Sequence, residues 1–212
     1  MPRPVLPILD RRLITASALA LIDEEGLGAF STVRLARRLG VRAPSLYHHV
    51  QSRAEILAGV AELVVRETRL PPYQPGDDWV AWLVDGCTSL RRAILRHPNA
   101  APVLLEHLPR DLLTSYYNIG AGILTIAGVP LALQCLVLDS LETYTISSGL
   151  ITATAGLTDP PFATEREDVN PHLARAAAAD SSVDAEDRFR LGVRAVAVGA
   201  VRSSVVLRGA DR

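Results

Sequence analysis

Apolar residues recur every three to four positions along most of the chain, and this spacing predicts helices. No alternating strand pattern and no Asn-Gly hairpin signal occurs, so we predict an all-α fold. The predicted helices cover residues 10–25, 32–39, 52–70, 77–97, 100–107, 110–127, 131–154, 172–179 and 184–207, with a further short helix that begins at Pro44.

Residues that favour helix ends divide the first quarter of the chain. Gly26 and Gly40 suit the left-handed residue that follows a helix, and Pro44 suits a first helical turn. Ser52 and Glu55 form the pattern of a capping box. The region therefore predicts two short helices joined by a tight turn and followed by a strongly capped helix.

This arrangement favours a helix-turn-helix, which places a short helix in the major groove of DNA. Its small core is expected from Val33, Leu35, Ala36, Leu39, Val41, Leu46 and Val50. Residues 1–53 hold eight arginines against four acidic residues, whereas the remainder holds 14 arginines against 19. A basic head on an acidic body indicates that the head binds a polyanion.

The residue types of the chain exclude some kinds of catalytic and binding site. All 22 basic residues are arginine, which excludes a lysine Schiff base and a phosphate loop that ends in GK[ST]. Cys87 and Cys135 lie in apolar contexts and are predicted to be reduced core residues. The apolar run 119–138 is long enough to cross a bilayer. Because Gly128 and Pro130 break it, we predict two buried helices and no membrane span.

Two stretches carry a resemblance: LITASALALIDEEGLGAFS at 13–31 and LARRLGVRAPSLYHHVQSRAEIL at 35–57. They resemble the DNA-binding domain of the TetR/AcrR family of one-component repressors. The resemblance implies a double-stranded DNA operator as partner, contacted by Thr32, Val33, Arg42, Ala43, Pro44, Ser45, Tyr47, His48, His49 and Arg53. Valine at 33 departs from the tetracycline repressors, which place a base-reading arginine there, and it could contact at most a thymine methyl.

Other interpretations of these residues remain open. Tyr47 could be a core aromatic, and Arg37 and Arg38 could form only a solvated face. His48 and His49 suggest a metal, but adjacent helical residues point about 100° apart and helical metal pairs prefer i, i+4 spacing. We therefore predict no metal and no cofactor.

Residues 77–208 resemble the family's regulatory domain more weakly, through Asp78-Trp79, Arg96-His97-Pro98 and the stretch FRLG at 189–192. We predict a DNA-binding domain at 1–56, joined by helix 52–70 to an effector-binding and dimerisation domain at 57–212. The resemblance implies that helices 131–154 and 184–207 form a four-helix bundle in a homodimer. Close approach would use Ser147, Ser148, Gly149, Gly192 and Gly199; packing within one chain is the alternative.

Effector contacts are predicted on helices that would surround a cavity. Asp139 and Glu142 share a helix face and are either polar anchors for a ligand or part of an interface or exposed stripe. Leu104 stands where the tetracycline repressors have a metal-ligating histidine, which argues against a magnesium–tetracycline pocket. The predicted effector residues are Trp82, Leu90, Leu104, His107, Tyr116, Ile119, Cys135, Asp139, Glu142 and Thr143.

The sequence thus favours a cytoplasmic, homodimeric repressor that a small, largely apolar effector releases from a palindromic operator. One alternative is a small helical enzyme that uses His97, Glu106 and His107, although no nucleophile motif accompanies them. Another is a helical interaction module whose basic head binds an acidic partner.

Overall fold

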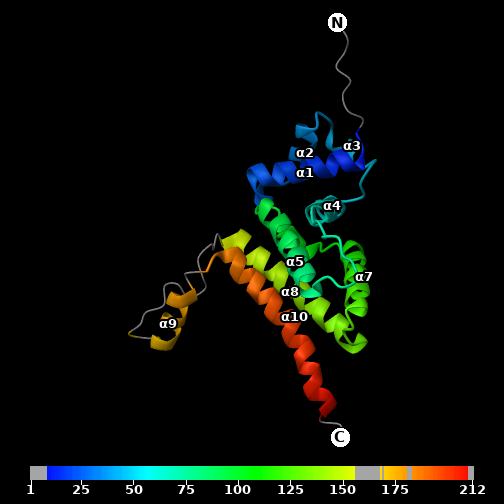
Figure 1. The fold of residues 1–212 in the computed structure, drawn as a ribbon. Helices are drawn as coiled ribbons and strands as arrows, with labels where there is room; N and C mark the ends of the chain where they lie inside the picture. Colours follow the sequence, from blue (N-terminus) through cyan, green and yellow to red (C-terminus); the bar gives the residue numbers. More distant parts are fainter. Residues whose placement is uncertain (1–8, 156–167, 169, 181–182, 210–212) are drawn as a thin grey trace.

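The structure is a computed structural model that describes residues 9–155, 168, 170–180 and 183–209. All regular structure in these residues is helical, as predicted (Figure 1). The helices are α1 (Arg11–Glu25), α2 (Thr32–Arg38), α3 (Ala43–Leu46), α4 (Arg53–Arg66), α5 (Trp79–Arg96), α6 (Val103–Glu106), α7 (Arg110–Ile126), α8 (Leu131–Ala155), α9 (Pro171–Asp180) and α10 (Ala185–Gly209).

The predicted helix ends in the first quarter of the chain are confirmed. The Asp10 carboxylate accepts a hydrogen bond from the Leu13 N–H at 2.7 Å, and the Ser31 hydroxyl accepts one from the Arg34 N–H at 3.2 Å. Gly26 and Gly40 have φ values of 83° and 69°, which favour glycine because it lacks a Cβ. These caps fix where α1 and α2 begin and end.

The structure corrects three local details. A short 3-10 turn, Leu27–Ala29, was not predicted. The Glu55 carboxylate accepts a hydrogen bond from the N–H of Gln51, whereas a capping box would use that of Ser52. Helix α4 ends at Arg66, four residues before the predicted end. The N–H of Arg69 bonds to the Ser89 hydroxyl on α5 at 2.7 Å, and Pro71 disfavours helical backbone at the residue that precedes it.

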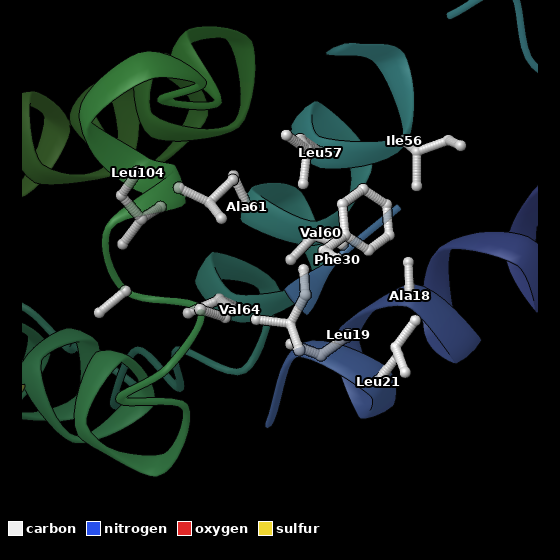
Figure 2. Packing of buried hydrophobic residues seen from close by; sticks show 14 of the residues in the cluster. Ala18, Leu19, Leu21, Phe30, Ile56, Leu57, Val60, Ala61, Val64 and Leu104 are labelled. Atoms are coloured by element: carbon white, nitrogen blue, oxygen red, sulfur yellow. The ribbon is translucent and has the colours of Figure 1, made fainter. Parts of the chain in front are cut away.

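A continuous apolar core joins the first four helices to the body. Figure 2 shows Leu19, Phe30 and Val60 packed together, with Leu104 of α6 beside α4. The same cluster includes Ile94 of α5 and Leu150 of α8. The helix-turn-helix is therefore anchored on the body by buried apolar surface as well as by the chain itself.

One residue of the predicted small core is misplaced. Val33 is 58% exposed, whereas Leu35 and Leu46 are fully buried. Helix α2 turns Leu35 and Ala36 inward, so position 33 points to solvent. Val33 is therefore available on the surface of the helix-turn-helix.

Helices α1 and α4 approach closely at a glycine. A Cβ on Gly59 would lie 2.7 Å from the Thr15 methyl carbon, closer than carbon atoms pack. The Thr15 hydroxyl is itself held by the Arg11 carbonyl at 2.7 Å, so its side chain has little freedom to move away. This contact sets the separation of the two helices that carry the DNA-binding head.

The body is built on α5, α8 and α10, which lie side by side in Figure 1, with α7 against α8. Their apolar faces form a second cluster that includes Trp82, Val137 and Phe189. Both cysteines are free, as predicted, but Cys135 is exposed. Its prediction as a core residue was wrong because it lies on the outward face of α8.

Gly128, at φ 76°, separates α7 from α8 as the sequence predicted. In the part of the chain that the structure describes, no helix is both long and apolar enough to cross a membrane.

Candidate DNA-binding surface and effector cavity

The ten predicted DNA-contacting residues lie on or beside α2 and α3, which form one end of the ribbon in Figure 1, and at the start of α4. They occupy the first turn of α2, the N-cap of α3, α3 itself, the three residues after α3, and the first residue of α4. Exposed among them are Val33, Arg42, Pro44, Tyr47, His48, His49 and Arg53, whereas Thr32, Ala43 and Ser45 are half-buried. Whether each of them touches DNA stays a prediction.

Tyr47 links the two helices of this surface. Its ring is 48% exposed, so the alternative of a core aromatic is wrong. Its hydroxyl lies 3.4 Å from the Thr32 hydroxyl at the start of α2. Two hydroxyl groups from different helices therefore share one patch, as a phosphate contact would require.

Acidic residues within the head neutralise some of its arginines. Glu24 holds both terminal nitrogens of Arg38, at 2.6 and 2.7 Å, and these hydrogen bonds lower the pKa of Glu24. Arg34 forms an ion pair with Glu25 through one of its nitrogens. The interpretation of Arg38 as part of a solvated face therefore fits better than a DNA contact.

Arg37 and Arg42 differ from these paired residues. Both are exposed and have no ion pair among the described residues. Arg53 also lacks a carboxylate partner, and its guanidinium stacks over the buried Phe30 ring at 5.3 Å. The head thus presents cations whose charge is free to meet a polyanion.

The principal apolar cavity lies in the body between α5, α7 and α8, against the chain that follows α4. Its free volume is about 80 Å³. That space holds only a few water molecules, so a larger ligand would need its walls to move. It is lined by Thr68, Leu70, Trp82, Leu83, Gly86, Cys87, Leu90, Leu113, Tyr116, Tyr117, Gly120, Leu138, Leu141, Glu142 and Thr145.

Four of the ten predicted effector residues line this cavity: Trp82, Leu90, Tyr116 and Glu142. The structure places the other six elsewhere. Leu104 is buried in the first apolar cluster, and His107 lines a polar surface groove beside Arg110. Cys135 and Asp139 line an exposed groove between α7 and α8, while Ile119 and Thr143 are exposed.

Glu142 and Asp139, which were predicted to share one helix face, differ in how deeply they are buried. Glu142 is 9% exposed, accepts a hydrogen bond from Arg110 at 2.9 Å and accepts another from the Tyr117 hydroxyl. Burial and this carboxylate raise the pKa of Tyr117, so its hydroxyl remains a donor. Glu142 is thus a paired carboxylate at the cavity wall, and Asp139 faces solvent.

Sequence reasoning missed several lining residues. The Thr68 side chain is buried, and its hydroxyl has no hydrogen-bond partner within the described residues. The cavity also contains the Cys87 thiol, whose pKa burial raises to about 11. No sequence signal marked Thr68, because it stands between two charged residues and only the end of α4 turns it inward.

Three of the five small residues predicted for subunit contact make close contacts within the chain. A Cβ on Gly149 would meet the Ile94 side chain at 3.0 Å, and one on Gly192 would clash with the Tyr144 hydroxyl. Ser148 accepts a hydrogen bond from Arg91 at 3.0 Å. These three residues thus pack within the chain, and whether any of the small residues also contacts a second subunit stays a prediction.

The histidines of the enzyme alternative have separate partners. His97 bonds to Asp23 and Glu67, whereas His107 lies 3.9 Å from Glu106. No group of three or more histidine, cysteine, aspartate or glutamate side chains in the described parts of the chain is placed to hold a metal ion.

Comparison with known proteins agrees with this geometry. Residues 14–60 match the family model "Bacterial regulatory proteins, tetR family", a span that covers α2, the turn and α3. The class D tetracycline repressor of Escherichia coli is 29% identical over 194 residues, which are 90% of this chain and 88% of that protein. The helix-turn-helix is therefore of the TetR type, and the whole chain is similar to TetR-family regulators.

Solved structures of TetR-family proteins share the whole fold. ActR of Streptomyces coelicolor, in complex with actinorhodin, is 28% identical, with a TM-score of 0.77 over 93% of this chain and 97% of that one. A possible TetR-family regulator from the same organism is 25% identical, with a TM-score of 0.76 over 90% and 98%. The chain thus has the all-α fold of a TetR-family regulator, with an N-terminal helix-turn-helix and a larger C-terminal domain.

Proposed function

We propose that this protein is a homodimeric TetR-family repressor that binds a palindromic operator and is released by a small, largely apolar effector. The observation that carries the proposal is the exposed surface of α2 and α3, with its unpaired arginines and its linked Tyr47 and Thr32 hydroxyls. The proposal assigns residues 1–56 to DNA binding and 57–212 to effector binding and dimerisation. Operator binding implies a cytoplasmic protein.

The ten predicted contact residues divide by chemistry on this surface. The hydroxyls of Thr32, Ser45 and Tyr47, with the Arg53 guanidinium, suit phosphate oxygens. Arg42, at the N-cap of α3, suits a guanine edge, and Val33 suits a thymine methyl. The other four, Ala43, Pro44, His48 and His49, adjoin them on or just after α3.

Homodimerisation rests on outward faces of α8 and α10. Leu131 and Ile151 at the two ends of α8 are 76% and 57% exposed, and Leu191 of α10 is 59% exposed. Exposed apolar residues on two adjacent helices suit a four-helix bundle with a second copy. Two heads are also what a palindromic operator needs, since one short helix reads few bases.

The cavity supports an effector that is mostly apolar. Thr68 and Leu70 line it just after α4, so a bound molecule would press on the end of the helix that carries the head. ActR, a similar protein, was solved in complex with actinorhodin, which supports a small-molecule effector for this fold. The two heads of a dimer can be spaced to fit the operator or not to fit it. A ligand that binds the second state more tightly shifts the equilibrium toward it, by an amount set by its difference in affinity for the two states.

The DNA-binding part is tested with a fluorescent duplex that contains the DNA upstream of the protein's own gene. We expect Arg42→Ala/Tyr47→Ala to weaken binding by at least roughly a hundredfold, because both heads lose a base-edge and a phosphate contact. Arg175→Ala on α9 removes a positive charge far from the head (Figure 1) and should leave binding unchanged.

Wild-type binding should also fall steeply with added salt, as counterion release requires. Binding that ignores sequence and survives the double substitution would contradict the proposal. The same complex tests the effector: an apolar compound that raises the melting temperature of the free protein should also release the duplex.

A further inference from the structure

A histidine at the end of α5 connects the body to the DNA-binding head. His97 Nδ1 lies 2.7 Å from Oδ2 of Asp23, in the last turn of α1, and Nε2 lies 2.9 Å from Oε1 of Glu67, which caps α4. Its side chain is 15% exposed. One imidazole thus joins three helices at the place where head and body meet.

Both ring nitrogens face carboxylates, and this decides the charge of the ring. An ionised carboxylate only accepts hydrogen bonds, and a neutral imidazole donates just one. The two contacts are therefore both satisfied only when the ring carries two N–H groups, as the imidazolium. Burial by itself would lower the pKa of His97, but the hydrogen bonds with Glu67 and Asp23 outweigh burial and raise it.

Neighbouring groups hold the Glu67 carboxylate and the backbone of Asp23 in place. Arg96 donates to the second Glu67 oxygen at 2.6 Å, and the hydrogen bonds from His97 and Arg96 outweigh burial and lower the pKa of Glu67. The Asn99 amide donates to the Asp23 carbonyl at 2.8 Å. The charged groups around the imidazole are thus Asp23 of α1, Glu67 of α4 and Arg96 of α5.

We propose that His97 is a proton-dependent tie that positions the DNA-binding head on the body, so that the head is held firmly when the ring is charged and loosely when it is neutral. Glu67 is followed directly by Thr68 of the cavity wall, so the tie and the cavity act on the same end of α4. The consequence for operator binding rests on the proposed function; the tie itself does not.

The sign of the pH effect follows from the raised pKa of His97. Its contribution is fully present below the unfolded-state pKa, about 6.5, and is lost as pH rises through the higher folded-state value. Glu67 stays ionised between pH 6 and pH 9, because its pKa is lowered. Loss of the tie in this range therefore reports the imidazole.

The first test uses the full-length protein without DNA. Titration of the five histidines by NMR, with His97 assigned from the spectrum of His97→Gln, should give His97 a midpoint above about 6.5. At pH 6 the melting temperature of His97→Gln should lie about 2–4 °C below that of the wild type, and the gap should shrink by pH 9. His172→Gln, at an exposed position of α9, should show no gap at either pH.

A midpoint at or below 6.5, or a gap of constant size, would overturn the tie, because a purely structural contact gives no pH profile. The titration is measured on the wild-type protein, so it can be read even if His97→Gln folds poorly. In that case Glu67→Gln serves for the assignment, because removing the Glu67 carboxylate should shift the His97 signal.

The second test measures affinity for the upstream duplex at pH 6 and pH 9. A firmly held head loses less freedom on binding. We therefore expect the wild type to bind the duplex more tightly at pH 6 than at pH 9, and this ratio to exceed that of His97→Gln by at least about fivefold. An equal pH dependence in the two proteins would overturn the link to DNA binding. If neither binds the duplex, the proposed function fails, while the NMR and melting results still decide the tie.

Discussion

The head and the body of this protein, which is similar to TetR-family regulators, use polar side chains in opposite ways. In the head, Arg37 and Arg42 are exposed and unpaired among the described residues, and Tyr47 projects beside Thr32. In the body, the polar groups of the cavity are buried or half-buried, and its one carboxylate, Glu142, is bound to Arg110 and Tyr117.

This difference follows from what each region has to bind. DNA is a polyanion whose phosphates exchange solvent and counterions for protein contacts, so exposed and mobile cations suit it. A small apolar molecule has to be enclosed, and polar groups in its cavity destabilise the fold unless they are paired. Thr68 and Thr145 are exceptions, because their buried hydroxyls have no hydrogen-bond partner among the residues described.

The largest expected effect separates core from surface within the head. Leu46 is fully buried and Val33 is 58% exposed, although both are apolar residues of the helix-turn-helix. Leu46→Ala should lower the free energy of unfolding by about 2–5 kcal/mol, while Val33→Ala should change it by less than about 0.5 kcal/mol. Urea denaturation measures both, and similar losses in the two variants would show that Val33 supports the fold.

A smaller effect is expected in the body. Tyr117→Phe removes the hydroxyl that donates to buried Glu142 and should cost about 1.5–3 kcal/mol, as hydrogen bonds to charged groups do. The matched control is Tyr116→Phe, whose hydroxyl lies 3.5 Å from the Val65 carbonyl, at the limit of a hydrogen bond. Equal unfolding midpoints for Tyr117→Phe and the wild type would mean that Glu142 is held by Arg110 alone.

The fold was predictable where local rules decide it. Gly26, Gly40 and Ser31 marked the ends of the head helices, and Asp78 marked the start of α5, because caps act through neighbouring backbone groups. The all-α class and the break at Gly128 followed in the same way.

The cavity was predictable only in part, because its lining depends on how distant helices pack. Spacing along α8 could not show that Glu142 turns inward while Asp139 and Cys135 turn outward. Nor could it show that Gly149 makes room for Ile94 of the same chain. Thr68 carried no signal, since its burial depends on the place where α4 ends.

The central claim is that the surface of α2 and α3 reads DNA as one half of a pair. Hydroxyl-radical footprinting on the DNA upstream of the protein's own gene tests it most directly. We predict two protected half-sites related by a palindrome, with centres about 34–36 Å apart or a multiple of that spacing, and no such pattern for Arg42→Ala/Tyr47→Ala. Uniform protection along the duplex, or the same footprint from the double variant, would contradict the claim.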